Sequence, residues 1–259
     1  MNPLLPFDEL IQTKDGINDV PDTWSQGRGA FGGYVTGVMM RALEDSAPGR
    51  PLRSLTAELC GPLTAGTCSV DLSVLREGNA VTTTAVKLSQ NGEVQAHGVG
   101  VLGRERTTEH DRTDLPPPSF APWREVVPVP YGGDFTPSFM QHFEMRILRG
   151  VPFAGAAEPL VEGWVRPKRP GARRDAAYLA ACIDCFYPCL YAIEKRVRPM
   201  ATIAFTFQPF ELAGDPDAPL AYRARMVASA GGYCVELREL WSEEGRLVAL
   251  NQQTMVIIK

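Results

Sequence analysis

Hydrophobic and polar residues follow the same order twice along this chain. Residues 54–102 and 201–257 each run from a strand-like stretch through a turn to further strand-like stretches. Aligning the two copies places Pro62 on Pro209 and Gly92 on Gly245, so the offset drifts only from 147 to 153 residues. The repeat predicts a duplicated unit that folds as an internal pseudo-dimer, with a seam between its copies as the place to search for a site.

Helical periodicity interrupts the first copy at one place. Apolar residues recur at i, i+1, i+4, i+5, i+8 and i+9 from Tyr34 to Leu43, which predicts one buried helix face ending at Ala47-Pro48-Gly49. An extended segment is expected near residues 10–20. Stretches enriched in β-branched residues and separated by turn signals predict strands over residues 53–60, 67–76, 81–89 and 93–102.

The second copy repeats this plan after a stretch rich in proline and charge. Residues 104–137 are predicted to be a linker without regular structure. An Ala-rich helix is expected over 173–185, stopped by Pro188, with strands over 141–148, 161–165, 201–210, 220–229, 233–241 and 247–258. A central helix wrapped by an antiparallel sheet is the hotdog arrangement. We therefore expect an α+β double hotdog, with units at 1–103 and 138–259 joined by the linker.

Composition narrows the function. A net charge of −4 argues against nucleic acid as a partner, because phosphate binding requires clustered Lys and Arg. No apolar run reaches the roughly 20 residues of a membrane span, and the N-terminus does not resemble a secretory signal, so a cytoplasmic protein is expected. The Cys182-Ile-Asp-Cys185 motif, with Cys189 nearby, lacks a second ligand pair, so buried free thiols are expected rather than a zinc site.

A Gly-rich loop precedes the first helix. Residues 27–32 match GxGxxG, but no hydrophobic strand precedes them and no βαβ alternation follows, which argues against a dinucleotide site. The amides of Gly32 and Gly33 at the head of the helix are candidates to polarise a substrate carbonyl as an oxyanion site. The alternative is a tight loop that packs beneath the helix.

One carboxylate stands out. Asp184 lies among apolar residues at the end of the second helix, where burial and the helix dipole both disfavour its ionised form. Such a group is either satisfied by partners or used for chemistry. The ungapped repeat places Gly37 opposite it, so only one copy carries the carboxylate. No GxSxG motif is present, and none of the three histidines lies near a nucleophile motif.

Several segments together resemble the type II acyl-CoA thioesterases, the TesB-like double hotdogs. They are WSQGRGAFGGYVTGVMMRAL, the run from Leu75 to Gly78 with the strand behind it, Phe143–Arg146 and Gly163–Arg166. The resemblance implies that Asp184, Thr202 and Gln253 bind and orient an attacking water. Gln252 is rejected because strand alternation sends it to the opposite face. The chain departs from the family at Ala204-Phe205, where many members carry Asp-His.

The resemblance implies hydrolysis of acyl-CoA thioesters without a metal or redox cofactor. Two alternatives are a non-catalytic acyl-CoA binder and an enoyl-CoA hydratase, for which His97 is the candidate histidine but has no visible acidic partner. A dense basic stretch either holds coenzyme A phosphates or is a solvated loop. It comprises Arg166, Lys168, Arg169, Arg173 and Arg174. Hotdog sheets often pair edge to edge, so a homodimer or higher homo-oligomer is expected.

Overall fold

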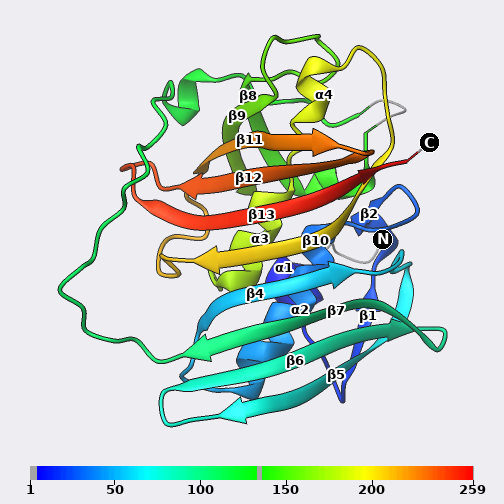
Figure 1. Ribbon diagram of the computed structural model, residues 1–259, viewed down its shortest axis with the longest axis vertical. Helices are drawn as coiled ribbons and strands as arrows, with labels where there is room; N and C mark the ends of the chain where they lie inside the picture. Colours follow the sequence, from blue (N-terminus) through cyan, green and yellow to red (C-terminus); the bar gives the residue numbers. More distant parts are fainter. Residues whose placement is uncertain (1–4, 133–135, 259) are drawn as a thin grey trace.

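The computed structural model describes residues 5–132 and 136–258, and its main feature is one antiparallel sheet of eleven strands. In Figure 1 the sheet faces the viewer and the two longest helices lie behind it. The strand order is β1-β5-β6-β7-β4-β10-β13-β12-β11-β9-β8. The bounds are β1 Ile17–Val20, β4 Leu52–Leu59, β5 Gly66–Glu77, β6 Val81–Gln90, β7 Glu93–Gly103, β8 Phe143–Arg149, β9 Leu160–Pro167, β10 Met200–Pro209, β11 Leu220–Ala230, β12 Tyr233–Trp241 and β13 Leu247–Ile257.

The predicted repeat is visible in this order. Strands β5-β6-β7-β4 are followed across the sheet by β10-β13-β12-β11, which is the same succession reversed. The halves join where β4 and β10 pair antiparallel, from Ala204 opposite Glu58 to Phe207 opposite Leu55. The double hotdog predicted from the sequence is therefore confirmed.

Two helices pack side by side against the sheet. They are α2, Gly32–Ser46, and α3, Ala176–Asp184, and both are almost entirely buried. The helix α3 begins three residues later than predicted because Asp175 caps it, accepting a hydrogen bond from the Tyr178 amide. The helices approach closely at Gly33, where an added Cβ would lie 2.9 Å from Ala181 Cα. Glycine at this position brings the head of α2 against the end of α3.

Shorter elements complete the chain. The predicted extended segment near residues 10–20 is only partly correct, because the helix α1 spans Phe7–Leu10 and only β1 is extended. The helix α4, Leu190–Ile193, was not predicted. The remaining elements are the 3₁₀ turns η1 Asp22–Trp24, η2 Trp123–Glu125 and η3 Ser138–His142, and the two-stranded ribbon of β2 Ser25–Gln26 and β3 Gly29–Ala30.

Most of the predicted linker lacks regular structure, but one part of it is fixed to the second unit. Trp123 in η2 is buried and packs in a cluster with Trp164 and Trp241. The Arg146 guanidinium lies 4.0 Å above the Trp123 ring and donates to the Trp123 carbonyl oxygen. These contacts hold the C-terminal part of the linker against β8, β9 and β12. Residues 133–135 of the linker lie outside the described residues.

The cysteine motif has a packing role. Cys182, Cys185 and Cys189 are buried and unpaired, as predicted, while Cys60 is exposed. Burial raises the pKa of the Cys182 thiol to about 12, which keeps it protonated. Within the described ranges, no group of three or more His, Cys, Asp and Glu side chains is placed to hold a metal ion. The helices within these described ranges also lack the length and apolar character that a membrane crossing requires.

The loop before α2 is anchored by His142. The Nε2–H of this residue donates to the Thr23 carbonyl oxygen at 3.1 Å, and the ring stacks on Trp24 at 4.3 Å. Burial lowers the pKa of His142 to about 4, so the folded state favours the neutral ring. The unfolded chain therefore binds more protons between pH 6.5 and pH 4, and the stability that this residue contributes is lost as pH falls through that range.

We therefore expect His142→Phe to flatten the fall of Tm on acidification between pH 6.5 and pH 4. The substitution keeps the stacking on Trp24 and removes the titrating group. Melting curves of both proteins across this range measure the effect. His110→Phe, at an exposed position, is the matched control and leaves the slope unchanged. Equal slopes in wild type and His142→Phe would contradict the assignment.

Candidate active site

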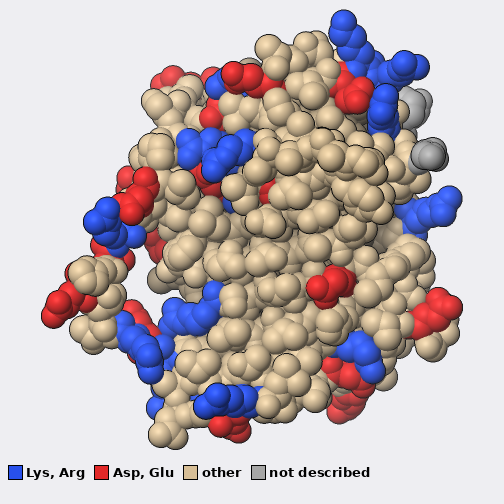
Figure 2. All heavy atoms as spheres, in the orientation of Figure 1, with Lys and Arg blue, Asp and Glu red and all other residues tan. Residues whose placement is uncertain are grey.

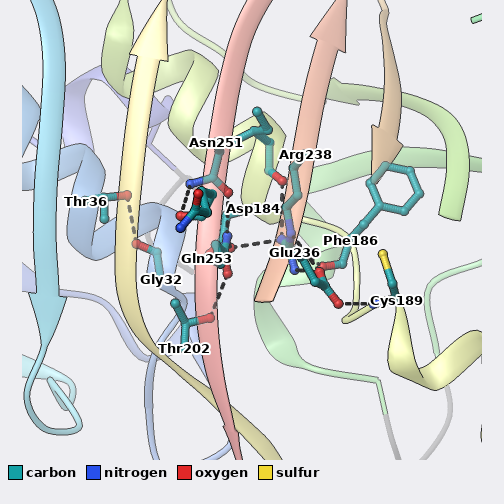
Figure 3. A network of polar contacts seen from close by, with 12 residues as sticks. Gly32, Thr36, Asp184, Phe186, Cys189, Thr202, Glu236, Arg238, Asn251 and Gln253 are labelled. Carbon is teal, nitrogen blue, oxygen red and sulfur yellow. Dashed lines mark hydrogen bonds and ion pairs between the residues drawn. The ribbon is translucent and has the colours of Figure 1, made fainter. Parts of the chain in front are cut away.

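Asp184 lies at the seam between the two units. It is the last residue of α3, and its side chain is 9% exposed. The carboxylate faces the first turn of α2, as Figure 3 shows, and an added Cβ on Gly32 would lie 2.7 Å from its Oδ2 atom. The carboxylate thus lies at the negative end of its own helix and at the positive end of the other unit's helix. The negative end of α3 was evident from the sequence, but only the fold shows that the positive end of α2 lies beside the same carboxylate.

Gln253 connects the predicted trio. Its side chain is fully buried on β13, whereas Gln252 is exposed, as alternation predicted. The Gln253 Nε2 group donates to Asp184 Oδ1 at 2.6 Å and to Asn251 Oδ1 at 2.9 Å. The hydroxyl of Thr202 donates to Gln253 Oε1 at 2.8 Å. The two acceptors fix which end of the Gln253 amide faces Asp184 (Figure 3).

A β-bulge aims Thr202 into this site. Phe205 pairs with Gln253 and Ala204 with Thr254, but Thr202 pairs with Met255, so Ile203 is an extra residue on β10. Paired residues of an antiparallel sheet share a face, and the bulge therefore places Thr202 on the same face as Phe205, three positions away. Without the bulge, strict alternation would turn the Thr202 hydroxyl away from Gln253.

Two charged residues that sequence reasoning missed complete the network. Arg238 on β12 donates to Asp184 Oδ1 at 3.2 Å and pairs with Glu236 at 3.1 Å. Desolvation by burial raises the pKa of the Asp184 carboxyl, and Arg238, Gln253 and the Gly33 amide act in the opposite direction. Their alternating positions place Glu236 and Arg238 on one face of the strand, but only the structure shows that this face turns toward the helices.

The Gly33 amide acts on the Asp184 carboxyl. Its hydrogen bond to the Asp184 carboxylate contributes to lowering the pKa of that group. A role for the amides of Gly32 and Gly33 as an oxyanion site stays a prediction. Gly32 lies beside Asp184 Oδ2 and stays a candidate.

The first unit holds an apolar counterpart of this site. Leu52 pairs with Leu102 next to a bulge on β4, just as Thr202 pairs with Met255, and Leu55 pairs with Gly100 as Phe205 pairs with Gln253. Leu52 and Gly100 thus occupy the places of Thr202 and Gln253. A Cβ on Gly100 would lie 2.6 Å from the Leu43 side chain.

Among the described residues the polar network therefore occurs in one unit, as the sequence predicted, but the helix residue opposite Asp184 differs from the prediction. Leu43 packs at the first unit's equivalent of the site, where the ungapped alignment indicated Gly37. The two copies differ in helix length, with fifteen residues in α2 and nine in α3. An ungapped alignment cannot follow that difference.

The basic stretch divides between two places. Arg166 pairs with Glu144 at 2.9 Å, and Lys168 and Arg169 are exposed just after the end of β9. Arg173 and Arg174 line a cavity of about 410 Å³ with Arg50, between the end of α2 and the start of α3. That cavity lies at the opposite end of the helix pair from Asp184. A role for Arg166, Lys168 and Arg169 in holding coenzyme A phosphates stays a prediction.

His97 does have an acidic partner, contrary to the expectation from sequence. Its Nδ1 atom lies 2.9 Å from Glu58 Oε2, and the two side chains are 50% and 49% exposed. Their neighbours Ala57 and Ala96 are fully buried on the helix-facing side of β4 and β7. Strand alternation places the His97–Glu58 pair on the outer face of the sheet, away from Asp184.

Family comparisons match both halves of the chain. Residues 20–103 match the acyl-CoA thioesterase N-terminal domain, and residues 112–257 match the acyl-CoA thioesterase C-terminal domain. The chain belongs to the acyl-CoA thioesterase family. This membership confirms the resemblance found in the sequence and identifies the protein as a thioesterase, with an acyl-CoA as its substrate class.

Solved structures share the thioesterase's fold across its whole length. A hot dog protein of unknown function from Alicyclobacillus acidocaldarius has a TM-score of 0.88 at 24% identity, covering 98% of each chain. The tesB protein of Mycobacterium avium subs paratuberculosis has a TM-score of 0.79 at 16% identity, covering 98% of each. Acyl-CoA thioesterase II TesB2 of Mycobacterium marinum has a TM-score of 0.73 at 17% identity, covering 97% of this chain and 96% of the other. The search of curated proteins gave no match.

Proposed function

We propose that the thioesterase hydrolyses acyl-CoA thioesters by direct attack of a water that Asp184 activates and that Thr202 and Gln253 orient. The observation that carries this proposal is the continuous set of hydrogen bonds from Thr202 through Gln253 to Asp184. It brings together a carboxylate, an amide and a hydroxyl from α3, β13 and β10 at the head of α2. These groups accept a proton and fix an oxygen without forming a covalent intermediate.

The two oxygens of Asp184 have different surroundings. Oδ1 accepts hydrogen bonds from Gln253 and Arg238, and Oδ2 is turned toward Gly32. We assign Oδ2 as the atom that takes the proton from water. The water oxygen bonds to the thioester carbonyl carbon, and the carbon–sulfur bond then breaks. The products are the free acid and the thiol of coenzyme A, with the proton on Asp184 available to the leaving sulfur.

The Gly32 amide is the donor that we assign to the carbonyl oxygen. It belongs to the first turn of α2, where backbone N–H groups lack intrahelical acceptors and favour developing negative charge. Gly33 supports the same step indirectly, because its amide binds Asp184. We propose no metal or redox cofactor for this chemistry, since a carboxylate and polarised amides suffice for the hydrolysis.

Gln253→Ala is expected to lower kcat by about 10²-fold or more. Misplacing reacting groups by about 1 Å is enough for a loss of this size. The substitution removes a hydrogen bond to Asp184 and leaves the Thr202 hydroxyl without its acceptor. Release of free thiol from the acyl-CoA that wild type cleaves fastest measures it. Gln252→Ala, one residue away on the exposed face, is the matched control and retains wild-type kcat. Equal losses in both variants would count against the assigned site.

Two other functions make different predictions for the same protein. A non-catalytic binder gives a rise of Tm with acyl-CoA but no thiol release. A hydratase adds water to an enoyl-CoA, and His97→Gln abolishes that reaction. We favour hydrolysis because the His97–Glu58 pair lies on the outer face of the sheet. A cytoplasmic location and self-association into a homodimer or higher homo-oligomer stay predictions.

A further inference from the structure

Arg238 is a buried cation at the centre of the site. Its side chain is 2% exposed, and its guanidinium contacts carboxylates on two sides. The Nη1 atom lies 3.2 Å from Asp184 Oδ1, while Nε and Nη2 lie 3.2 and 3.1 Å from Glu236 Oε2. Nη1 also lies 3.4 Å from the Ile183 carbonyl oxygen, in the last turn of α3. Removing a guanidinium from water is costly, so a cation in this position requires these partners.

Glu236 determines where the guanidinium lies. Its side chain is fully buried, and its Oε1 accepts a hydrogen bond from the Cys189 amide just beyond the end of α3. Its Oε2 accepts from Arg238. Glu236 therefore ties the chain that follows Asp184 to the same cation that contacts Asp184. Figure 3 shows the resulting row of Asp184, Arg238 and Glu236 between α3 and β12.

The charges around Asp184 come from several elements. The Gly33 amide of α2, Gln253 of β13 and Arg238 of β12 favour its ionised form, while Glu236 of β12 opposes it. The Tyr222 hydroxyl of β11 and the Cys189 thiol also face Arg238. Two carboxylates thus share one guanidinium. A change at Arg238 and a change at Glu236 must act on Asp184 with opposite signs.

We propose that Arg238, aimed by Glu236, is a positioning residue that holds Asp184 as a carboxylate with Oδ1 fixed and Oδ2 directed toward the head of α2. The inference rests on the proposed function of Asp184 as the base. Arg238 contacts the base and not the reacting atoms, so its contribution is to the ionisation and orientation of Asp184. The thioesterase thus uses a buried ion pair to keep a desolvated carboxylate ready to accept a proton.

The test is the pH dependence of kcat/KM for thiol release in three variants. Arg238→Met removes a positive charge within 4 Å of Asp184, so the pKa of the carboxyl rises. The acidic limb of the profile is expected to move to higher pH by about 1–3 units. Glu236→Gln keeps an oxygen for the Cys189 amide but removes the negative charge of Glu236. Among the described residues, Asp184 is then the only carboxylate paired with Arg238, so its pKa falls and the acidic limb moves to lower pH. Arg238→Lys keeps the positive charge, so its acidic limb is expected to lie close to that of wild type.

Arg238→Met alone leaves the buried Glu236 carboxylate unpaired and could unfold the protein. The double variant Arg238→Met with Glu236→Gln is therefore also measured, because it leaves no unpaired buried charge at these two positions. Its acidic limb is expected between those of the two single variants. Arg225→Met is the matched control: Arg225 pairs with Glu239, whose other partner Arg223 remains, and the profile keeps its shape. A purely structural role for Arg238 lowers activity equally at every pH, and unshifted limbs in folded variants would overturn the proposal.

Failure of this inference is distinguishable from failure of the proposed function. If Asp184→Asn is inactive while the Arg238 and Glu236 variants keep the wild-type acidic limb, Asp184 is the base and Arg238 does not tune it. If Asp184→Asn retains turnover and the same acidic limb as wild type, the base is another group and both proposals are wrong.

Discussion

Asp184→Asn is expected to lower kcat for acyl-CoA hydrolysis by about 10²–10⁴-fold, the range that general-base catalysis contributes. Asparagine has nearly the same shape and retains an oxygen for the Gln253 and Arg238 hydrogen bonds, but it cannot accept the proton of the attacking water. The fold should survive, because Arg238 remains paired with Glu236. Initial rates of thiol release, together with melting curves, separate lost chemistry from lost structure.

The matched control for this prediction is Glu58→Gln. Glu58 is a half-exposed carboxylate on the outer face of β4, paired with His97. Removing its charge should leave thioester hydrolysis unchanged. A folded Asp184→Asn enzyme with wild-type turnover would show that the Asp184 carboxylate is not the base, and a large loss in Glu58→Gln would direct attention to the outer face instead.

Gly32→Ala is expected to lower kcat/KM by about 10²-fold, the effect of a displacement of roughly 1 Å among reacting groups. The added Cβ would lie 2.7 Å from Asp184 Oδ2, closer than non-bonded atoms allow. Gln253 and Arg238 anchor the other oxygen, so the carboxylate cannot turn aside without losing those contacts. Alanine is a better helix former than glycine, so the helix itself should not be weakened.

Gly103→Ala is the matched control for this steric argument. An added Cβ there would meet its nearest neighbour at 3.4 Å, an ordinary contact, and the residue lies at the end of β7. Rates and melting temperatures of the two variants should therefore diverge, with activity lost only in Gly32→Ala. Full activity in Gly32→Ala would mean that the head of α2 does not approach the reacting carboxylate.

Much of the fold was predictable because its determinants are local. Alternation and turn residues predicted the strands of both units, and the i, i+4 spacing of apolar residues predicted α2. Duplication then supplied the long-range arrangement that local patterns lack, since two similar units are expected to pack around a pseudo-twofold axis. The trio of Asp184, Thr202 and Gln253 was predicted through resemblance to the family, and the structure brings the three side chains together.

The remaining features depend on contacts between distant parts of the chain. Charged residues at alternating strand positions ordinarily face solvent, so Glu236 and Arg238 gave no clear sign that they meet Asp184. The bulge at Ile203 that aims Thr202 is set by strand pairing across the sheet. Sequence alone could not place the end of α3 against the head of α2, so it gave no sign that the Gly33 amide acts on Asp184. The His97–Glu58 pair likewise joins β7 to β4 across 39 positions.

The outer face of the sheet has a different character from the seam. Figure 2 shows it largely uncharged over its middle strands, with many of the Lys, Arg, Asp and Glu side chains toward its margins. The polar chemistry of the molecule is instead enclosed between the sheet and the two helices. Activity should therefore respond to conservative changes around Asp184 far more than to changes on the broad outer face.

The most direct test of the central claim is the release of free thiol by the purified wild-type protein from a panel of short, medium and long acyl-CoAs. The account predicts turnover on at least one chain length, with one free acid formed for each thiol. No thiol release on any of them, from a folded protein whose Tm rises with coenzyme A, would contradict it and identify a binder that lacks hydrolytic activity.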